Sequence, residues 1–466
     1  MTRARRFCAT FCLAASALAL PALAQNTASA LPATTASAAS AAASAAASAA
    51  ASAATSASAA SHGIAPATDA WRAALPRDPA AATQAYLDRL SPQARAKSDA
   101  YFEGGYWLQL WSLLLTLVIA WLLLRAPPAQ AARRWCANRS RRVAQVASYG
   151  VFYILATWLL TLPFTVYQDF VREHEYGFAT QGFGAWFGEQ LTGLGIALVI
   201  GPVFVLAIFA VIRRAPERWW IGGAMVAIGF LVVAQVLAPV FIQPLFNTYK
   251  PLADSPLKRQ ILAMAQANGV PVDNVYEVDA SRQSTRVSAN VSGFLGTASI
   301  RLNDNLLRRT SDAQIRAVMA HEIGHFTMNH VAKTLLQFGL VIVSAFAFVA
   351  WAARALLRRY GERWQVRSVQ EVGSLPLLGA LFATALFLAT PLLNTIVRTM
   401  ETEADHFGLN LAREPDGMAE ALLAVAEYRK ADPGALEEML LFDHPSARTR
   451  IYNAMRWKAD MQRPSP

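Results

Sequence analysis

Six apolar stretches, each long enough to cross a lipid bilayer, constrain the fold of this chain more than any other feature. A helix needs about 20 apolar residues to span the hydrocarbon core. The composition agrees, because 55% of the residues are hydrophobic and only 16% are charged, whereas soluble proteins have about 25% charged residues. The sequence therefore predicts a multi-span α-helical membrane protein, with spans at approximately residues 106–124, 147–166, 188–212, 219–243, 333–357 and 374–397.

Arginine is distributed unevenly among the loops that join these stretches. The loops after the first, third and fifth stretches are rich in arginine, and the loop after the first has no acidic residue. The loop between the second and third stretches, residues 167–187, has one arginine and three acidic residues. Positively charged loops stay in the cytoplasm. The pattern therefore predicts that the polar segments 244–332 and 398–466 face the periplasmic side of a bacterial-type inner membrane.

The net charge of +11 is explained by the same loops. In a soluble protein, an excess of 42 Lys and Arg over 31 Asp and Glu would suggest nucleic-acid binding. Here many of the arginines lie in loops next to the predicted spans. We therefore expect the lipid bilayer, and no nucleic acid, as a partner of the basic residues.

The N-terminal region differs in composition from the rest of the chain. Residues 1–25 have a basic start, an apolar stretch and the small residues Ala22-Leu23-Ala24, which is the pattern of a signal peptide or signal anchor. Residues 26–73 are rich in Ala and Ser. Such a segment cannot build a core, so we expect a low-complexity linker.

The clearest chemical signal is the sequence His-Glu-Ile-Gly-His at residues 321–325. On a helix, His321 and His325 are four residues apart and share one face. Two neutral imidazoles at this spacing can bind one Zn²⁺, with Glu322 placed as general base for a water molecule. The chain has only seven histidines, so chance accounts poorly for the match. The motif predicts a catalytic zinc site.

The surrounding residues favour the helix that this motif requires. Ser311 and Gln314 form a capping box at a helix start, and Ile323 is among the apolar residues that would bury the helix. His330 lies five residues after His325 and points away from the ligand face. We expect it to be a supporting or interface residue rather than a ligand.

A catalytic zinc site usually has three protein ligands, so one more is needed. Glu401 and Asp405 would share one face of a helix, so that one could bind the metal while the other orients a histidine. Spacing alone does not distinguish Glu401 from Glu403, and a solvated acidic turn is the alternative for this segment. The downstream candidates are Glu401, Glu403, Asp405, His406 and His444.

With these residues the chain resembles the type I CAAX prenyl endopeptidase family, the integral-membrane zinc proteases of the gluzincin group. The resemblance covers about residues 80–460. Residues 398–405 read Arg-Thr-Met-Glu-Thr-Glu-Ala-Asp and are similar to the family's Arg-x-x-Glu-x-x-Ala-Asp pattern. The resemblance implies a zincin-like α+β metalloprotease domain, with a small sheet beside the His-Glu-x-x-His helix.

The resemblance also implies roles and domains. Glu401 would be the third zinc ligand and Asp405 the supporting carboxylate. His444 and Arg450 would stabilise the tetrahedral intermediate and hold substrate or zinc-site carboxylates. The chain then divides into two domains. Residues 74–243 form an N-terminal membrane domain with four spans, and residues 244–466 form a zinc metallopeptidase domain that is interrupted by two spans.

Members of this family have an edge strand before the catalytic helix that is thought to pair with the substrate backbone. Ser288, Ala289 and Asn290 occupy its place here. Ser288 stands where the family usually has Asn, and Asn290 where it has an aromatic residue, but strand pairing relies on backbone groups. The predicted orientation also differs from that of the eukaryotic members, so we do not expect a farnesylated substrate.

Together these features predict a zinc-dependent integral-membrane endopeptidase. Its substrates would be membrane-associated or unfolded proteins. The main alternative is a non-enzymatic membrane chaperone or assembly factor with a vestigial zinc site, against which the intact Glu322 argues. A transporter is a weaker alternative, because the spans lack the buried charges of an ion path.

Overall fold

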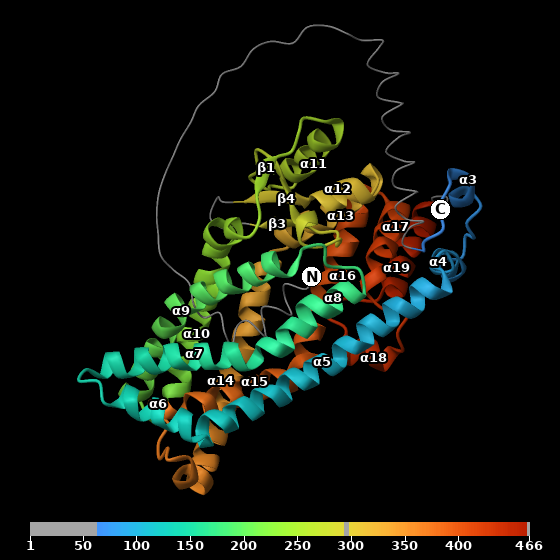
Figure 1. Ribbon diagram of the computed structural model, residues 1–466. Helices are drawn as coiled ribbons and strands as arrows, with labels where there is room; N and C mark the ends of the chain where they lie inside the picture. Colours follow the sequence, from blue (N-terminus) through green and yellow to red (C-terminus); the bar gives the residue numbers. More distant parts are fainter. Residues whose placement is uncertain (1–62, 293–297, 464–466) are drawn as a thin grey trace, which may run out of the picture.

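The computed structural model describes residues 63–292 and 298–463 (Figure 1). The predicted signal segment and residues 26–62 of the predicted linker lie outside the described residues. The linker was expected to continue to residue 73, but the structure differs there. Ile64 is 5% exposed and bridges to Leu90, and helix α3 spans Asp69–Ala73. Ile64 and Trp71 pack into the folded core, so the structured part of the chain begins before residue 73.

Within the described part of the chain, five helices are long and apolar enough to cross a membrane. They contain the first five predicted spans and extend beyond them. The helices are α5 (Pro92–Arg125), α7 (Arg142–Val166) continued by the π-helix η1 (Tyr167–Val171) and α8 (Arg172–Glu175), α9 (Phe183–Arg214), α10 (Trp219–Leu237) continued by η2 (Ala238–Ile242) and η3 (Gln243–Leu245), and α14 (His330–Trp364).

The sixth predicted span, residues 374–397, is not one straight helix. It is a pair, α15 (Leu375–Leu388) and α16 (Thr390–Ala412), bent by 52° at a short break. Pro391 lies in the first turn of α16, where its missing N–H and its ring are tolerated, but it cannot continue α15 as a regular helix. The bend directs α16 out of the bundle and toward the polar domain.

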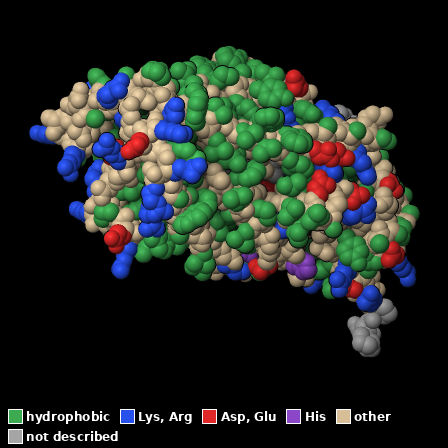
Figure 2. Space-filling model, turned by 90° about the horizontal axis from the view of Figure 1, so that it is seen from below, with side chains coloured by type: hydrophobic (Ala, Val, Ile, Leu, Met, Phe, Trp, Pro, Cys, Tyr) green, Lys and Arg blue, Asp and Glu red, His purple; other side chains and the backbone are tan. Residues whose placement is uncertain are grey.

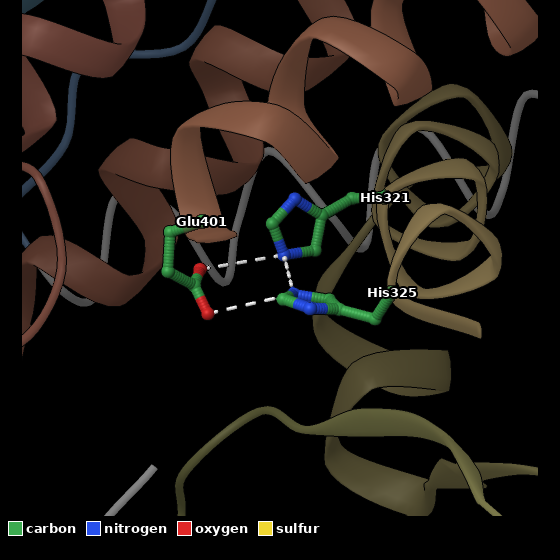
Figure 3. A group of neighbouring side chains, drawn as sticks. All are labelled: His321, His325 and Glu401. Atoms are coloured by element: carbon green, nitrogen blue, oxygen red, sulfur yellow. Dashed lines mark hydrogen bonds and ion pairs between the residues drawn. The ribbon is translucent and has the colours of Figure 1, made fainter. Parts of the chain in front are cut away.

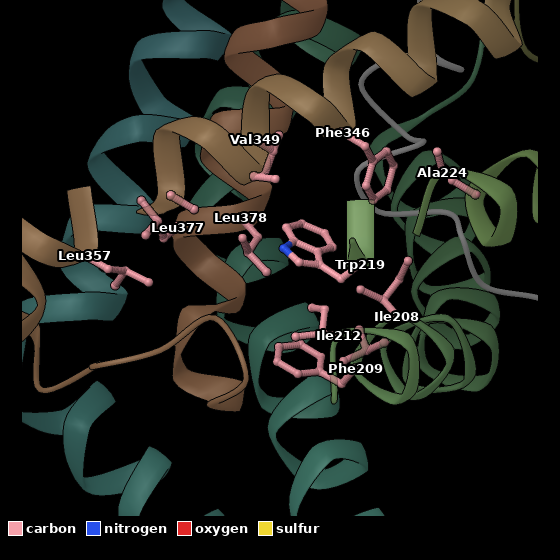
Figure 4. Close-up of a cluster of buried hydrophobic side chains, with 14 of the residues drawn as sticks. Ile208, Phe209, Ile212, Trp219, Ala224, Phe346, Val349, Leu357, Leu377 and Leu378 are labelled. Atoms are coloured by element: carbon pink, nitrogen blue, oxygen red, sulfur yellow. The ribbon is translucent and has the colours of Figure 1, made fainter. Parts of the chain in front are cut away.

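The membrane helices pack around a cluster of buried apolar side chains (Figure 4). Trp219 is 2% exposed, and its ring lies 6.0 Å from that of Phe346. Phe209 and Ile212 of α9 are fully buried in the same cluster. Other apolar side chains on these helices, such as Trp121, are exposed. Figure 2 shows hydrophobic side chains gathered in a band across the face that it draws. Such a band is what a bilayer covers.

A four-stranded mixed sheet follows the fourth span. Its strand order is β1-β2-β4-β3, with β2 and β4 parallel and the other pairs antiparallel. Ile300 and Leu302 of β4 are fully buried and belong to one core cluster with Met319 of α13. The sheet therefore positions α13. The strands are β1 (Tyr249–Pro251), β2 (Val275–Val278), β3 (Ala289–Ser292) and β4 (Ser299–Asn303).

The remaining helices join the spans or cover the polar domain. Leu87 of α4, Leu422 of α17 and Ile451 of α19 meet in one buried cluster. These elements are α4 (Pro79–Leu87), α6 (Pro127–Ala137), α11 (Pro256–Ala267), α12 (Asp304–Arg309), α13 (Asp312–Thr327), α17 (Pro415–Val425), α18 (Ala435–Leu441), α19 (Ala447–Met461) and the 3-10 turns η4 (Ala280–Arg282), η5 (Val372–Ser374) and η6 (Ala426–Tyr428).

The polar domain lies at one end of the bundle. Helix α4, which precedes the first span, packs against α19 near the C-terminus, so both lie at the same end (Figure 1). Four membrane-capable helices lie between α4 and the sheet. An even number of crossings returns the chain to the side from which it started, which agrees with this arrangement. The opposite end carries the loops around α6 and the end of α14, and Lys and Arg gather there (Figure 2). The architecture is a multi-span helical membrane protein with a zincin-like domain.

Candidate metal centre

Helix α13 carries the two histidines of the motif. The predicted capping box is present, because Ser311 Oγ accepts from Gln314 N–H and Gln314 Oε1 accepts from Ser311 N–H at 2.9 Å. These bonds satisfy backbone donors that a helix start leaves free. His321 is 7% exposed and His325 lies one turn later on the same face. The expected helix is therefore confirmed.

Helix α16 crosses α13 at very short range because both helices have a glycine at the crossing. A Cβ on Gly408 would lie 2.9 Å from His321 N, and a Cβ on Gly324 would lie 3.3 Å from the Ala404 carbonyl oxygen. Any larger residue at Gly408 would have to push the two backbones apart. Neither glycine was singled out from the sequence. Their only local signal is a glycine inside a helical pattern, which indicates close packing.

The crossing brings Glu401 to the two imidazoles (Figure 3). His321 Nε2 and His325 Nε2 are 3.0 Å apart, and each lies 3.4 Å from one oxygen of the Glu401 carboxylate. In a tetrahedral site with metal bonds of about 2.0–2.2 Å, ligand atoms lie about 3.3 Å apart. The spacing of the two imidazole nitrogens and the Glu401 oxygens therefore fits a single zinc-sized cation.

The other four candidates for the third ligand are not grouped with the two metal-facing imidazole nitrogens. Glu403 contacts His330 and Lys333 instead of the metal-facing nitrogens. His406 is exposed on the outer face of α16. Asp405 and His444 are buried next to the site, where Asp405 contacts His321 and His444 contacts Glu401. Of the five candidates, the structure favours Glu401, which spacing could not separate from Glu403.

Asp405 and Arg450 lie behind His321. The Nδ1 of His321 is 2.8 Å from Asp405 Oδ1, and Arg450 donates from Nε and Nη2 to the same carboxylate at 2.7 and 2.5 Å. Burial lowers the pKa of His321, but its bonds to Asp405 and Glu401 raise it to about 10 overall. A protonated imidazole cannot bind a metal, so a cation must displace this proton.

His444 contacts the same oxygen of the Glu401 carboxylate that faces His325. Its Nε2 is 3.0 Å from Glu401 Oε1, and its Nδ1 is 3.1 Å from Asp443. Burial lowers the pKa of His444 below its ordinary value, although Glu401 raises it in part. His444 and Arg450 thus both touch carboxylates of the centre, which is one of the two roles that the family resemblance implied.

Glu322 lies beside the two imidazoles on α13. Burial raises the pKa of Glu322 above its ordinary value, and His325 and His321 lower it in part. A raised pKa makes a carboxylate a stronger base near neutral pH, as a general base requires.

Two family models match adjacent parts of this chain. Residues 251–458 match peptidase family M48, and residues 76–248 match the N-terminal region of CAAX prenyl proteases, which is described as five membrane helices. The chain belongs to the CAAX prenyl endopeptidase family. It is therefore a membrane metalloprotease, and nothing in these similarities supports the non-enzymatic alternative.

Individual relatives agree with this assignment. The chain is 27% identical to the metalloprotease YhfN of Bacillus subtilis over 368 residues. The aligned region covers 78% of this chain and 86% of that protein. The chain is 34% identical over 194 residues to CAAX prenyl protease 1 of Saccharomyces cerevisiae, covering 40% of this chain and 41% of that protein. The crystal structure of S. mikatae Ste24p matches the fold with a TM-score of 0.66 at 22% identity, over 79% of this chain and 90% of that chain.

In this CAAX prenyl endopeptidase family member, Ala289 and Asn290 are the first two residues of β3, and Ser288 directly precedes it. Strand β3 is the last strand in the sheet order. Ala289 and Asn290 pair with Leu302 and Arg301 of β4. Ser288 is exposed, and its N–H donates to Asn303 Oδ1. The predicted segment therefore does lie on an edge of the sheet that the structure describes.

An ion pair that sequence reasoning missed anchors the chain before this strand. Arg286 lies 2.6 Å from Glu173 and 2.7 Å from the hydroxyl of Tyr101. The backbone nearby is also held, because Thr285 N–H donates to the Phe178 carbonyl. These contacts join α8 and the loop after it to the segment before the edge strand. No local pattern reveals them, because the partners are far apart in the sequence.

Proposed function

We propose that this protein is a zinc-dependent endopeptidase whose metal is held by His321, His325 and Glu401. The observation that carries the proposal is the closeness of their ligand atoms, which all lie within 4.8 Å of one another. When bound, the ion supplies Lewis acidity, which polarises a peptide carbonyl and makes water more acidic. The histidine and carboxylate donors suit zinc.

Glu322 is the proposed general base. Its carboxylate takes a proton from the attacking water and gives it to the leaving amine. The position of Glu322 on α13, one residue after a ligand, supports this assignment. Asp405 is proposed to hold His321 with Nδ1 protonated, so that the Nε2 lone pair faces the metal.

His444 and Arg450 are proposed to stabilise the developing oxyanion as well as the carboxylates. Their observed contacts are with Glu401 and Asp405. For Arg450, two donors are already directed at Asp405, which favours a holding role. For His444, a shift from Glu401 toward a substrate oxygen would be needed.

The substrate is proposed to enter as an extended segment along β3. A strand edge offers backbone N–H and C=O groups in a regular row. Backbone pairing would explain why Ser288 and Asn290 can differ from the family's usual residues. Membrane-associated or unfolded proteins can supply such a segment, so we propose them as substrates.

The proposed location is a bacterial-type inner membrane with the zinc domain on the periplasmic side. The support is the arginine-rich end of the bundle opposite that domain. The signal segment 1–25, a linker that ends before Ile64, and the division of the rest of the chain into two domains after residue 243 remain part of this proposal. Reporter proteins fused after residues 310 and 466 test it. Periplasmic activity of both is expected, and a cytoplasmic signal from either would reverse the orientation and bring a prenylated substrate back into consideration.

Glu322→Gln tests the mechanism. The purified variant should retain one zinc per chain and lose about 10²–10⁴-fold in the rate of cleavage of an unfolded peptide substrate. Glu175→Gln, a change of the exposed glutamate at the end of α8, is the matched control, and this variant should cleave like the wild type. Full activity of the Glu322 variant with normal zinc content would refute the proposed base.

A further inference from the structure

His330 was expected to point away from the metal site, but the structure places it against His325. The two Nδ1 atoms are 2.9 Å apart. The other nitrogen of His330, Nε2, lies 3.1 Å from Glu403 Oε2, and Lys333 Nζ lies 2.8 Å from the same oxygen. His330 is 3% exposed. A chain of contacts therefore runs from the partly exposed Glu403 through the buried His330 to His325.

The backbone between α13 and α14 creates this contact. Asn329 has a φ of 55° and lies in the left-handed region, directly before the first residue of α14. The helix is interrupted at this residue, and His330 lies beside the last turn of α13. The His325 and His330 rings meet edge to face with centroids 4.9 Å apart. Five residues of separation within one continuous helix would not bring the rings together in this way.

Proton positions along the chain follow from the donors and acceptors. If His325 binds a metal through Nε2, that nitrogen carries no hydrogen, so Nδ1 carries it and donates. His330 Nδ1 must then accept, and its Nε2 carries a hydrogen that it donates to Glu403. The carboxylate can only accept, which agrees with this assignment.

We propose that His330 is a positioning residue that holds His325 in its metal-binding tautomer and that Glu403 holds His330 in turn. This inference rests on the proposed metal site. It assigns the two imidazoles different supports. His321 donates to a carboxylate directly, whereas His325 donates to a neutral imidazole. Supporting residues of this kind contribute about 10–100-fold to metal affinity.

Two substitutions separate the hydrogen bond from the shape of the ring. His330→Phe keeps a ring but has no acceptor, and should raise the dissociation constant for Zn²⁺ about 10–100-fold. His330→Asn can place its Oδ1 near the position of Nδ1 and should recover most of this loss. His406→Phe, a change of the exposed histidine on α16, is the control and should leave zinc affinity unchanged.

The measurement is competition between the full-length protein in detergent and a chelator of known zinc affinity, together with the visible spectrum of the Co²⁺-loaded protein. A weaker metal and a changed Co²⁺ spectrum in the Phe variant, reversed by Asn, support the proposal. If His330→Phe does not fold, near-wild-type zinc affinity of a folded His330→Asn variant still supports it.

Two results would overturn the inference: wild-type zinc affinity of folded His330→Phe, or equal losses in both variants. A wild-type protein that binds no stoichiometric zinc would instead refute the metal site itself, and this result is separate from both.

Discussion

The two sides of the metal centre are built differently. On the side of His321, Asp405 and Arg450 form a pair that is 2% and 9% exposed. On the side of His325, the chain of contacts leads to Glu403 and Lys333, whose side chains are 38% and 44% exposed. The first support ends in the protein core and the second ends at the solvent.

This difference follows from the cost of burying charge. A buried carboxylate needs a partner of opposite charge and hydrogen bonds, because water cannot stabilise it. Asp405 has both in Arg450 and His321. Glu403 is partly hydrated, so a neutral imidazole can separate it from the ligand. We therefore expect substitutions on the His321 side to have much larger effects than equivalent substitutions on the His325 side.

Arg450→Ala should have the largest effect. It leaves the carboxylate of Asp405 buried without its cation, and breaking such a pair costs about 3–5 kcal/mol in the free energy of unfolding. Denaturant titration of the purified protein in detergent measures this loss. Arg456→Ala, on the same helix but with a side chain that is 67% exposed, should change little. Equal stability of the two variants would contradict the assigned difference between the sides.

Asp405→Asn should come next. The amide keeps the shape of the side chain but loses the charge that faces both His321 and Arg450. We expect the dissociation constant for Zn²⁺ to rise about 10–100-fold, as measured by chelator competition at constant pH. An unchanged constant would mean that His321 does not depend on this carboxylate.

Glu403→Gln should weaken zinc binding by less than about tenfold, because the amide oxygen can still accept from His330 and the site is partly exposed. The comparison with Asp405→Asn is direct, since each change replaces one carboxylate by its amide. If Glu403→Gln proved the more harmful of the two, the proposed order of the sides would be reversed.

Lys333→Gln should have the smallest effect. Ion pairs exposed to solvent contribute about 0–1 kcal/mol, and salt screens them. Zinc affinity of this variant should lie close to that of the wild type, and raising the ionic strength should shrink the remaining difference. A large loss that persists at high salt would show that Lys333 acts through more than its charge.

Much of this centre could be predicted from the sequence because its signals are local. The capping residues Ser311 and Gln314, the helical spacing of His321 and His325, and the positions of the first five spans depend on neighbours a few residues away. The structure confirms these features, although the five helices extend beyond the predicted spans. Glu401 could be separated from Glu403 only through the family resemblance, since both fit a helix beside the site.

The features that could not be predicted depend on contacts between distant segments. The contact of His330 requires the left-handed turn at Asn329, which residue spacing along a helix does not reveal. The bend before α16 is marked by Pro391, but a proline is also tolerated inside spans, as Pro202 is inside α9. Ile64 is buried in a cluster that includes residues of α17 and α19, which lie nearly the whole chain away.

The positions of the ligands on the chain have one further consequence. Helix α13 lies directly before α14, and α16 directly after α15, so the ligands bracket the last two membrane helices. A cation shared by His321, His325 and Glu401 would be a cross-link that closes this long loop. Cross-links of long loops restrict the unfolded chain most. Removal of the ion would therefore release the ends of a membrane hairpin in addition to stopping catalysis.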